Sequence, residues 1–426
     1  MEIQHVKEPE TQNLGESASR QVDEAESQNQ LQDKSTTFIK TCLNGLNVLS
    51  GVGTLSVSFA LSEGGWLCLI AFFLIAIICF YTGVLIKRCM DSNPLIRTYP
   101  DIGEEAFGRK GRIVISIFMY VELFLVAVEF LIMEGDNLHK LFPKLCVHIF
   151  GKEIGGKKVF IILTALVMLP TTWLRSLSLL AYISIGGAFT SFALIGVIFW
   201  IGEFEGVGFS EKGVLWRWNG VLTSINMFTF CYLGHAVFPT LYSSMKDKKR
   251  FPKVLIVCFA LSTISYGSMA VLGYLMYGEN VMPQVTLNLP TKKISSKVAI
   301  YMTLITPITK YALIISPIAK ALEEKLNVDG RRRISLMIRS TLVIITAIMA
   351  LVIPFFEYVM AFIGAFLGIS ASILFPCVCY LKIVKASRHL GVELIFIAIV
   401  IVVGLFVGSI GTYISIRDIV NRIHKY

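Results

Sequence analysis

Charged residues are scarce in this chain. Asp, Glu, Lys and Arg make up 16% of its 426 residues, whereas 55% are hydrophobic. A soluble domain carries about 25% charged residues, so the deficit indicates an integral membrane protein. The spans of a β-barrel would alternate apolar and polar residues, and runs such as GWLCLIAFFLIAIICFYTGVLI do not. We therefore expect an all-α protein that crosses the bilayer many times.

Several functional signatures are also missing. The nine cysteines show neither zinc-binding spacing nor a disulfide ladder, and no catalytic cluster such as H-E-x-x-H lies in a span. The net charge of +10 comes mostly from short loops without interleaved aromatic residues. The first 30 residues have no apolar core and hence no cleavable signal. We expect no enzyme activity, metal, cofactor or nucleic-acid partner, and the bilayer itself as the surrounding partner.

Apolar runs long enough to cross a bilayer, which takes about 20 residues, recur along most of the chain. Residues 35–414 are predicted to form one transmembrane domain. Residues 1–34 hold eight acidic and three basic residues and no aromatic residue, which predicts a disordered tail. Residues 415–426 are predicted to be a short C-terminal tail. The eleven predicted spans lie near 38–61, 66–89, 112–136, 158–175, 178–202, 217–243, 252–277, 296–320, 333–353, 356–380 and 391–414.

The distribution of Lys and Arg predicts the orientation of the chain. With the N-terminus in the cytosol, the inside loops carry twenty of these residues and the outside segments carry thirteen. The positive-inside rule therefore favours a cytosolic N-terminus. The polar stretch between the second and third spans, YPDIGEEAFG, is predicted to form a short surface helix with Asp101 as its N-cap.

The first predicted span contains the stretch NVLSGVGTLSVSFAL, with Gly51 and Gly53 at its centre. Glycine weakens a helix by about 1 kcal/mol relative to alanine. The two glycines indicate either a small-residue packing face or a helix that unwinds at membrane depth, which is tolerated only beside a cavity.

The sixth predicted span favours the second interpretation. It has Gly234 and His235 at its centre and Pro239 four residues later, where proline removes a backbone donor and clashes with the carbonyl of His235. We expect that carbonyl to be left free. Interrupted helices at corresponding positions of two halves point to a transport site between inverted repeats. Two repeats of five spans account for ten of the eleven predicted spans, and the eleventh lies outside the repeats.

Several motifs in this order resemble those of the amino acid/auxin permease family, and most closely its plant and fungal vacuolar branch. The motifs are GVGTLSVSFAL followed by EGGW, TYPDIGEEAFG, CYLGHAVFPTLYSSM, PITKYAL and FIGAFLGISASILFPCVCYLKI. The resemblance covers about residues 36 to 414. It implies a LeuT-type 5+5 inverted-repeat fold with about 11 transmembrane helices and proton-coupled transport of amino acids. Ser58 stands where family members often have proline.

An amino-acid substrate assigns roles to both breaks. Its carboxylate suits backbone amides at the first break, and its ammonium suits free carbonyls at the first or second break. Apolar and aromatic side chains, including Tyr120 of the third helix, would line the rest of the pocket, although core packing is an alternative role for each aromatic. The expected substrate-binding residues are Gly51, Gly53, Thr54, Leu55, Phe228, Cys231, Tyr232, Gly234 and Phe362.

Proton coupling requires groups that titrate, and three are expected to serve. His235 lies beside the second break, and the ordinary pKa of histidine is about 6.5; the alternative is a neutral ring bonded to a carbonyl. Glu122 lies seven residues before Glu129 on the third helix, nearer the middle of the span. Lys310, on the eighth helix, is expected to replace the metal ion that sodium-coupled relatives hold against the first helix.

The sequence thus predicts a secondary transporter of mainly neutral amino acids that works by alternating access. The resemblance favours the vacuolar membrane, with the plasma membrane as an alternative, and antiport over symport. A channel or a receptor-like protein is the rival interpretation. A channel should show a repeated filter or a charged ring, and a receptor should have seven spans and a ligand domain. The oligomeric state is left open.

Overall fold

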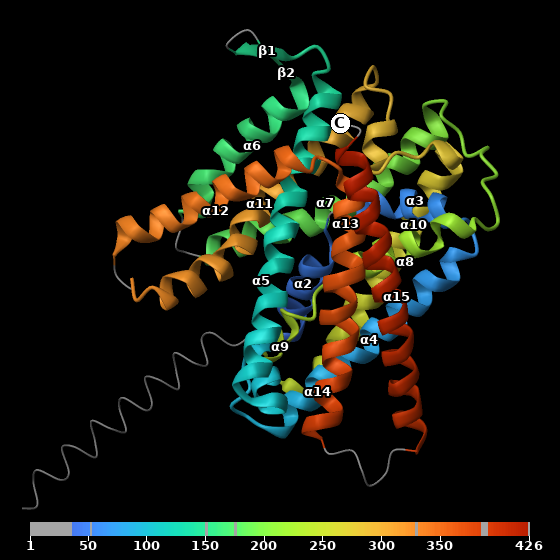
Figure 1. Cartoon of the computed structure of the whole chain (residues 1–426). Coiled ribbons are helices and arrows are strands. Elements are labelled where there is room, and N and C mark those ends of the chain that lie inside the picture. The colour runs from blue at the N-terminus through green and yellow to red at the C-terminus, as the bar shows by residue number, and fades with distance from the viewer. Residues whose placement is uncertain are drawn as a thin grey trace, which may run out of the picture.

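A computed structural model describes residues 36–51, 53–149, 152–173, 177–328, 331–384 and 391–424. The predicted tail 1–34 lies outside these residues. The α-helices, which Figure 1 shows as a bundle, are α2 (Phe38–Leu49), α3 (Gly53–Gly64), α4 (Cys68–Ser92), α5 (Tyr99–Leu141), α6 (Gly156–Thr172), α7 (Leu177–Phe204), α8 (Val221–Cys231), α9 (Phe238–Ser244), α10 (Phe251–Tyr277), α11 (Ile294–Lys325), α12 (Arg332–Val352), α13 (Phe356–Phe362), α14 (Phe375–Ile383) and α15 (Gly391–Ile423).

Short elements join and extend these helices. The strands β1 (Cys146–Ile149) and β2 (Lys152–Gly155) pair in an antiparallel hairpin between α5 and α6. A π-helix, η5 (Ile363–Leu374), connects α13 to α14. The 3-10 helices are η1 (Trp218–Gly220), η2 (Lys248–Arg250), η3 (Gly278–Asn280) and η4 (Val285–Asn288).

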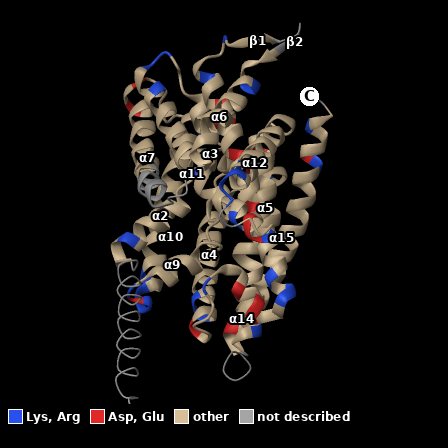
Figure 2. Ribbon diagram, turned by 90° about the vertical axis from the view of Figure 1, so that its left-hand side faces the viewer, with Lys and Arg blue, Asp and Glu red and all other residues tan. Residues whose placement is uncertain are grey.

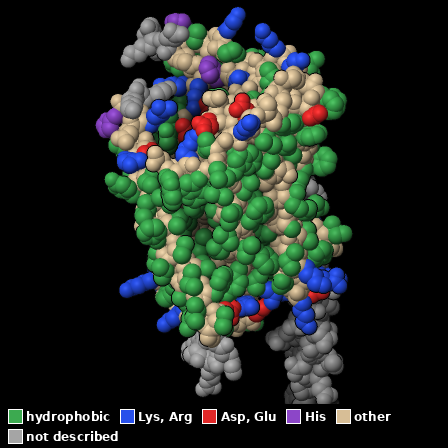
Figure 3. Space-filling model, turned by 90° about the vertical axis from the view of Figure 1, so that its right-hand side faces the viewer, with side chains coloured by type: hydrophobic (Ala, Val, Ile, Leu, Met, Phe, Trp, Pro, Cys, Tyr) green, Lys and Arg blue, Asp and Glu red, His purple; other side chains and the backbone are tan. Residues whose placement is uncertain are grey.

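The outer surface of the bundle is apolar, as a bilayer requires. Figure 3 shows a hydrophobic belt around the middle of one face, with Lys, Arg, Asp and Glu gathered above and below it. Within the described residues, seven helices are long and apolar enough to cross a membrane, and α2 with α3 makes an eighth if the bent pair is one span. The chain is therefore a multi-pass membrane protein, while the count of about eleven spans stays a prediction.

The helix α5 combines the expected surface helix with the third span. It begins at Tyr99, where the backbone N–H groups of Arg97 and Thr98 both donate to the Asp101 carboxylate, at 3.1 and 2.8 Å. The N-cap is Thr98, so the prediction of Asp101 as the N-cap was wrong by three positions: the carboxylate closes a capping box from inside the first turn. Gly108, with a φ of +65°, separates the surface turns from the span.

Both predicted interruptions are present. The helices α2 and α3 are bent by 51° at a break that contains Gly51. The helices α8 and α9 are separated by residues 232–237, and Pro239 lies in the first turn of α9, where its missing N–H leaves no helical bond unmade. The carbonyl of His235 is not free as expected, because it accepts a hydrogen bond of 3.3 Å from the Phe238 N–H.

The two ends of the described chain lie at opposite ends of the bundle. Thr36, just before α2, pairs with Met245, just after α9, through backbone hydrogen bonds. The labelled C-terminus lies at the other end, beside the start of α13 (Figure 1). We call these the N-side and the C-side. The helix α15 runs on to Ile423, so most of the predicted C-terminal tail, 415–426, continues the last helix instead.

Small residues let the last helices approach the sixth span closely. A Cβ atom added to Gly364 of η5 would lie 1.8 Å from the carbonyl oxygen of Asn226 in α8. Gly411 of α15 faces the side chain of the same asparagine. The backbones of three elements therefore meet around Asn226, which holds α8 in place beside its break.

Candidate functional site

A large cavity of about 1020 Å³ is lined by both breaks and extends toward the N-side of the bundle. Its inner end is lined by Gly51 and Gly53 of the first break and by Cys231 and Gly234 of the second. Its mouth is lined by residues at the start of α5 and by Glu324 and Lys325 at the end of α11. A cavity of this volume is at the upper end of the range for small-molecule sites, about 300–1,000 Å³.

Lys310 of α11 occupies the first break with its ammonium group. Its Nζ donates to the carbonyl oxygen of Asn47 at 2.6 Å and also to that of Ser50. The side chain is 7% exposed and lines the cavity. The unwinding of α2 releases these carbonyls from helical bonding, so a buried cation finds acceptors without a carboxylate partner. The expected meeting of the eighth helix with the first break is present.

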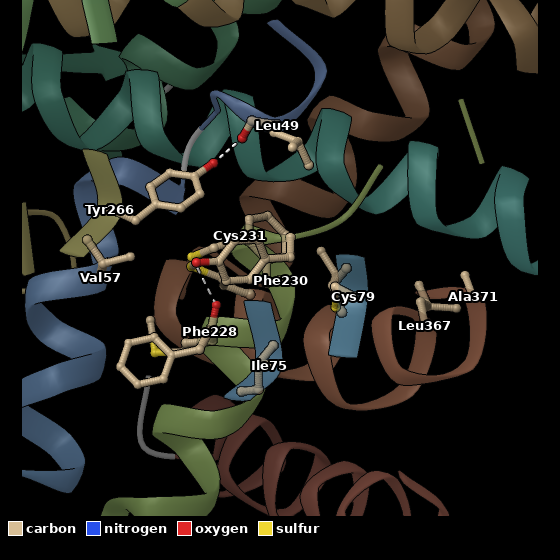
Figure 4. Close-up of a cluster of buried hydrophobic side chains, with 14 of the residues drawn as sticks. Leu49, Val57, Ile75, Cys79, Phe228, Phe230, Cys231, Tyr266, Leu367 and Ala371 are labelled. Carbon is tan, nitrogen blue, oxygen red and sulfur yellow. Dashed lines mark hydrogen bonds between the residues drawn. The ribbon is translucent and has the colours of Figure 1, made fainter. Parts of the chain in front are cut away.

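Tyr266 of α10 completes the first break. Its hydroxyl donates to the carbonyl of Leu49, the last residue of α2, as the dashed line in Figure 4 shows. The ring lines the cavity and is 1% exposed. Together with Lys310, this tyrosine satisfies the carbonyls of Asn47, Leu49 and Ser50, where the helix stops. The sequence interpretation missed Tyr266; its only signal was a polar aromatic residue in the middle of a long apolar run.

The two breaks touch each other. A Cβ atom added to Gly53 would lie 2.8 Å from the sulfur of Cys231 and 3.2 Å from its Cα. Gly53 begins α3 and Cys231 ends α8, so the ends of two half-helices meet at the inner end of the cavity. The positive N-terminal end of α3 and the negative C-terminal end of α8 are thereby brought side by side. Such a pair can hold a zwitterion.

Glu122 and Lys310 face the same cavity from opposite helices. Glu122 of α5 is 7% exposed, and its Oε2 has no hydrogen-bond partner in the described part of the chain. A carboxyl group with an unused oxygen on the wall of an open cavity can exchange a proton. The expected pair of intramembrane ionisable groups is therefore gathered beside the breaks.

His235 lies apart from this cavity. It is 1% exposed, and its Nε2 lies 3.0 Å from both the Cys79 carbonyl and the Thr82 hydroxyl oxygen of α4. The Thr82 hydroxyl donates to backbone carbonyls of its own helix. Both atoms are therefore acceptors, and Nε2 carries the hydrogen. This geometry matches the alternative weighed from the sequence, a neutral ring bonded to a carbonyl.

The expected pocket aromatics also lie elsewhere. Phe228 and Tyr232 are 0% exposed and pack with Phe72 of α4, at ring-centroid distances of 5.2 and 5.7 Å. Figure 4 shows Phe228 among side chains of the core. Phe362 stacks on Phe366 and does not line the cavity. Tyr120, also expected, is the exception, because it lines the cavity together with Phe130 and Phe230.

Thr54 and Leu55 line a separate space of about 20 Å³ on the other side of the break. Met133 of α5 and Thr303 and Thr306 of α11 share it. Its volume is that of about one water molecule. These two predicted residues therefore lie next to Gly51 and Gly53 but beyond the large cavity, as a thin layer between the breaks and the C-side.

Broken helices beside a cavity are features of the transporter folds that are built from inverted repeats. The fold has a solved counterpart, the crystal structure of MhsT in complex with L-phenylalanine. The two superpose with a TM-score of 0.57 at 14% identity, over 89% of this chain and 98% of that one. The predicted LeuT-type fold is thereby confirmed.

The chain belongs to the transmembrane amino acid transporter family, whose model matches residues 34–417. Amino acid transporter AVT1I of Arabidopsis thaliana is 48% identical over 91% of this chain and 96% of its own length. Amino acid transporter AVT1J of the same plant is 49% identical over 91% of this chain and 92% of its own. Membership confirms the family resemblance and the prediction that the chain is not an enzyme.

Proposed function

We propose that this protein carries mainly neutral amino acids across the vacuolar membrane in exchange for protons. The observation that carries the proposal is the cavity that ends at two touching helix breaks, with an ammonium and a carboxyl group on its walls. The names of the similar plant proteins support amino acids as the substrate class. A channel would instead need a continuous pore with a filter.

The substrate would bind at the inner end of the cavity, where Gly53 and Cys231 meet. Its carboxylate would accept hydrogen bonds from the amides at the start of α3, and its ammonium would lie toward the carbonyls that end α8. The apolar wall formed by Val126, Phe130 and Phe230 suits an uncharged side chain. Neutral amino acids fit because these three apolar side chains offer no charged partner to the side chain of a substrate.

Coupling would act through Lys310 and Glu122. A protonated Lys310 bridges α11 to the carbonyls of Asn47 and Ser50. Hydrogen bonds to a charged group contribute about 1.5–3 kcal/mol each, so loss of its proton would loosen α2 from α11. Glu122 lies on the same cavity and can receive or supply that proton. The cavity opens to the N-side, which the predicted orientation places in the cytosol.

Uptake into proteoliposomes of the purified chain tests this function. A panel of labelled amino acids is offered with and without an imposed pH gradient. We expect saturable uptake of neutral amino acids that the gradient increases, and Glu122→Gln abolishes the increase. Uptake that rises linearly with concentration, or that ignores the gradient in the wild type, would contradict a proton-coupled transporter and favour a channel or a receptor.

A further inference from the structure

The C-side of the bundle is closed by a buried polar network that joins four elements. Asn137 of α5 donates to the Gln284 side chain at 2.6 Å and accepts a hydrogen bond from Thr286 of η4 at 2.7 Å. All three residues are 0% exposed. The η4 segment is thereby fixed to α5.

An ion pair completes this network. Asp136, the neighbour of Asn137, lies 2.5 Å from Lys157 of α6 and accepts a hydrogen bond of 3.2 Å from Gln284. Lys157 also donates to the carbonyl of Pro354, in the turn before α13, at 2.7 Å. One lysine therefore ties α5, α6 and the start of α13 together. We call Asp136, Asn137, Lys157, Gln284 and Thr286 the C-side latch.

A carboxyl group without a partner lies beneath the latch. Glu129 is seven residues before Asp136, on the same face of α5 and about 10 Å deeper along the helix. It is 0% exposed, and neither of its oxygens has a hydrogen-bond partner among the described residues. Glu122 lies another seven residues earlier in α5, at the wall of the large cavity.

The charges around Glu129 do not balance if every group is ionised. The ionisable groups that interact with it are Glu357 of α13, Asp136 and Lys157. Beyond these, His139 faces Asp136, and Arg422 of α15 faces Glu357. Among the described residues of α11, α12 and η5, which also pack against α5, none adds a charge to this set. Three carboxyl groups thus face the partly buried Lys157 and the exposed Arg422, and an unpaired buried carboxylate such as that of Glu129 is costly in a membrane.

We propose that Glu129 is a proton-binding residue of the C-side gate, distinct from the Lys310 and Glu122 pair. With Asp136 paired to Lys157, Glu129 holds a proton, because its carboxyl group has no partner among the described residues. When a further proton arrives from the C-side, Asp136 becomes neutral and its ion pair with Lys157 is lost. The α6 and η4 contacts then loosen, and the closed side opens. This inference rests on the proposed function, because it supplies the second side of a proton-coupled cycle.

The test compares Glu129→Gln with Glu134→Gln in proteoliposomes of the full chain. Glu134 is a matched control, because it is also a buried glutamate of α5 (1% exposed) with a partnerless Oε1 among the described residues, but lies off the face shared by Glu129 and Asp136. Uptake of labelled L-leucine, with L-alanine as second probe, is measured with and without a pH gradient. For each amino acid, Glu129→Gln should lower the ratio of uptake with the gradient to uptake without it. The expected decrease is at least about fivefold, the lower end of typical coupling factors. Glu134→Gln should leave this ratio unchanged.

The outcomes separate this inference from the proposed function. A wild type that ignores the gradient refutes proton coupling and the gate site together. If the pH gradient increases uptake equally in the wild type and in Glu129→Gln, the gate site alone is overturned. If Glu129→Gln fails to fold, Asp136→Asn and Glu357→Gln replace it. Each should shift the pH dependence of uptake, and unchanged profiles in both would again overturn the gate site.

Discussion

At the scale of single residues, the site depends on where one cation lies. Lys310 ends on two carbonyls that the break in α2 sets free. In a continuous helix those carbonyls would be bonded to N–H groups one turn later, and the ammonium would lack acceptors. The lysine and the break therefore stabilise each other. Neither the lysine nor the glycines of the break would produce this local geometry alone.

Replacement of Lys310 tests this coupling. In the wild type, we expect uptake to be equal in sodium and in choline buffers, because under the proposed function the ammonium does the work of a metal ion. Lys310→Ala should reduce gradient-driven uptake at least about tenfold, which corresponds to loss of about 1.4 kcal/mol of interaction. Lys325→Ala, at the cavity mouth on the same helix, is the control and should retain uptake. A sodium requirement in the wild type would refute this role of Lys310.

His235 should behave as a structural residue. Its ring donates from Nε2 into α4 and lies outside the cavity. His235→Ala leaves the acceptors at Cys79 and Thr82 without this donor, so the free energy of unfolding should fall by about 1–3 kcal/mol. The pH dependence of transport should be unchanged. Thermal unfolding in detergent and uptake between pH 5 and pH 8 check both statements, and a flattened pH profile would restore His235 as the coupling group.

At the scale of elements, the two breaks work because they touch. Gly53 leaves no room for a side chain against Cys231, whereas a Cβ atom added to Gly51 would meet nothing within 4 Å. The glycines of the opening motif thus have different roles. Gly53 permits the contact between α3 and α8, and Gly51 lies at the open cavity.

Two alanine substitutions separate these roles. Gly53→Ala should push α3 away from the end of α8 and abolish uptake, because the amides and carbonyls that would hold a zwitterion are moved apart. Gly51→Ala should fold normally and keep transport, with an altered Michaelis constant. Equal uptake by both variants, at equal amounts of folded protein in the membrane, would show that the contact between the breaks is not part of the site.

The sequence predicted these elements better than it predicted their contacts. Glycine and proline disrupt helices through local physics, so both breaks could be located from the chain alone. The side of each helix that faces the cavity could not, because a break rotates the following half-helix by an amount that packing determines. Even on α8, before its break, spacing does not say which face meets the cavity: Phe230 lines it, whereas Phe228 lies in the core, as does Tyr232. The latch partners Asn137 and Gln284 are far apart in sequence and follow no local pattern.

At the scale of the whole molecule, the two ends of the bundle differ. The cavity reaches the N-side, where Glu324 and Lys325 line its mouth. The C-side is closed by the latch and by the thin layer that holds Thr54 and Thr303. Figure 2 shows Lys and Arg at both ends of the bundle. Under the proposed function, this arrangement would be the state of an alternating-access cycle that is open to the N-side.

The most direct measurement of the central claim is a density map of the protein in a lipid nanodisc with a transported amino acid bound. We predict density for the amino acid at the inner end of the cavity, with its carboxylate against the start of α3 and its ammonium toward the end of α8. A map in which α2 and α3 form one continuous helix, or in which the amino acid lies away from both breaks, would contradict the claim.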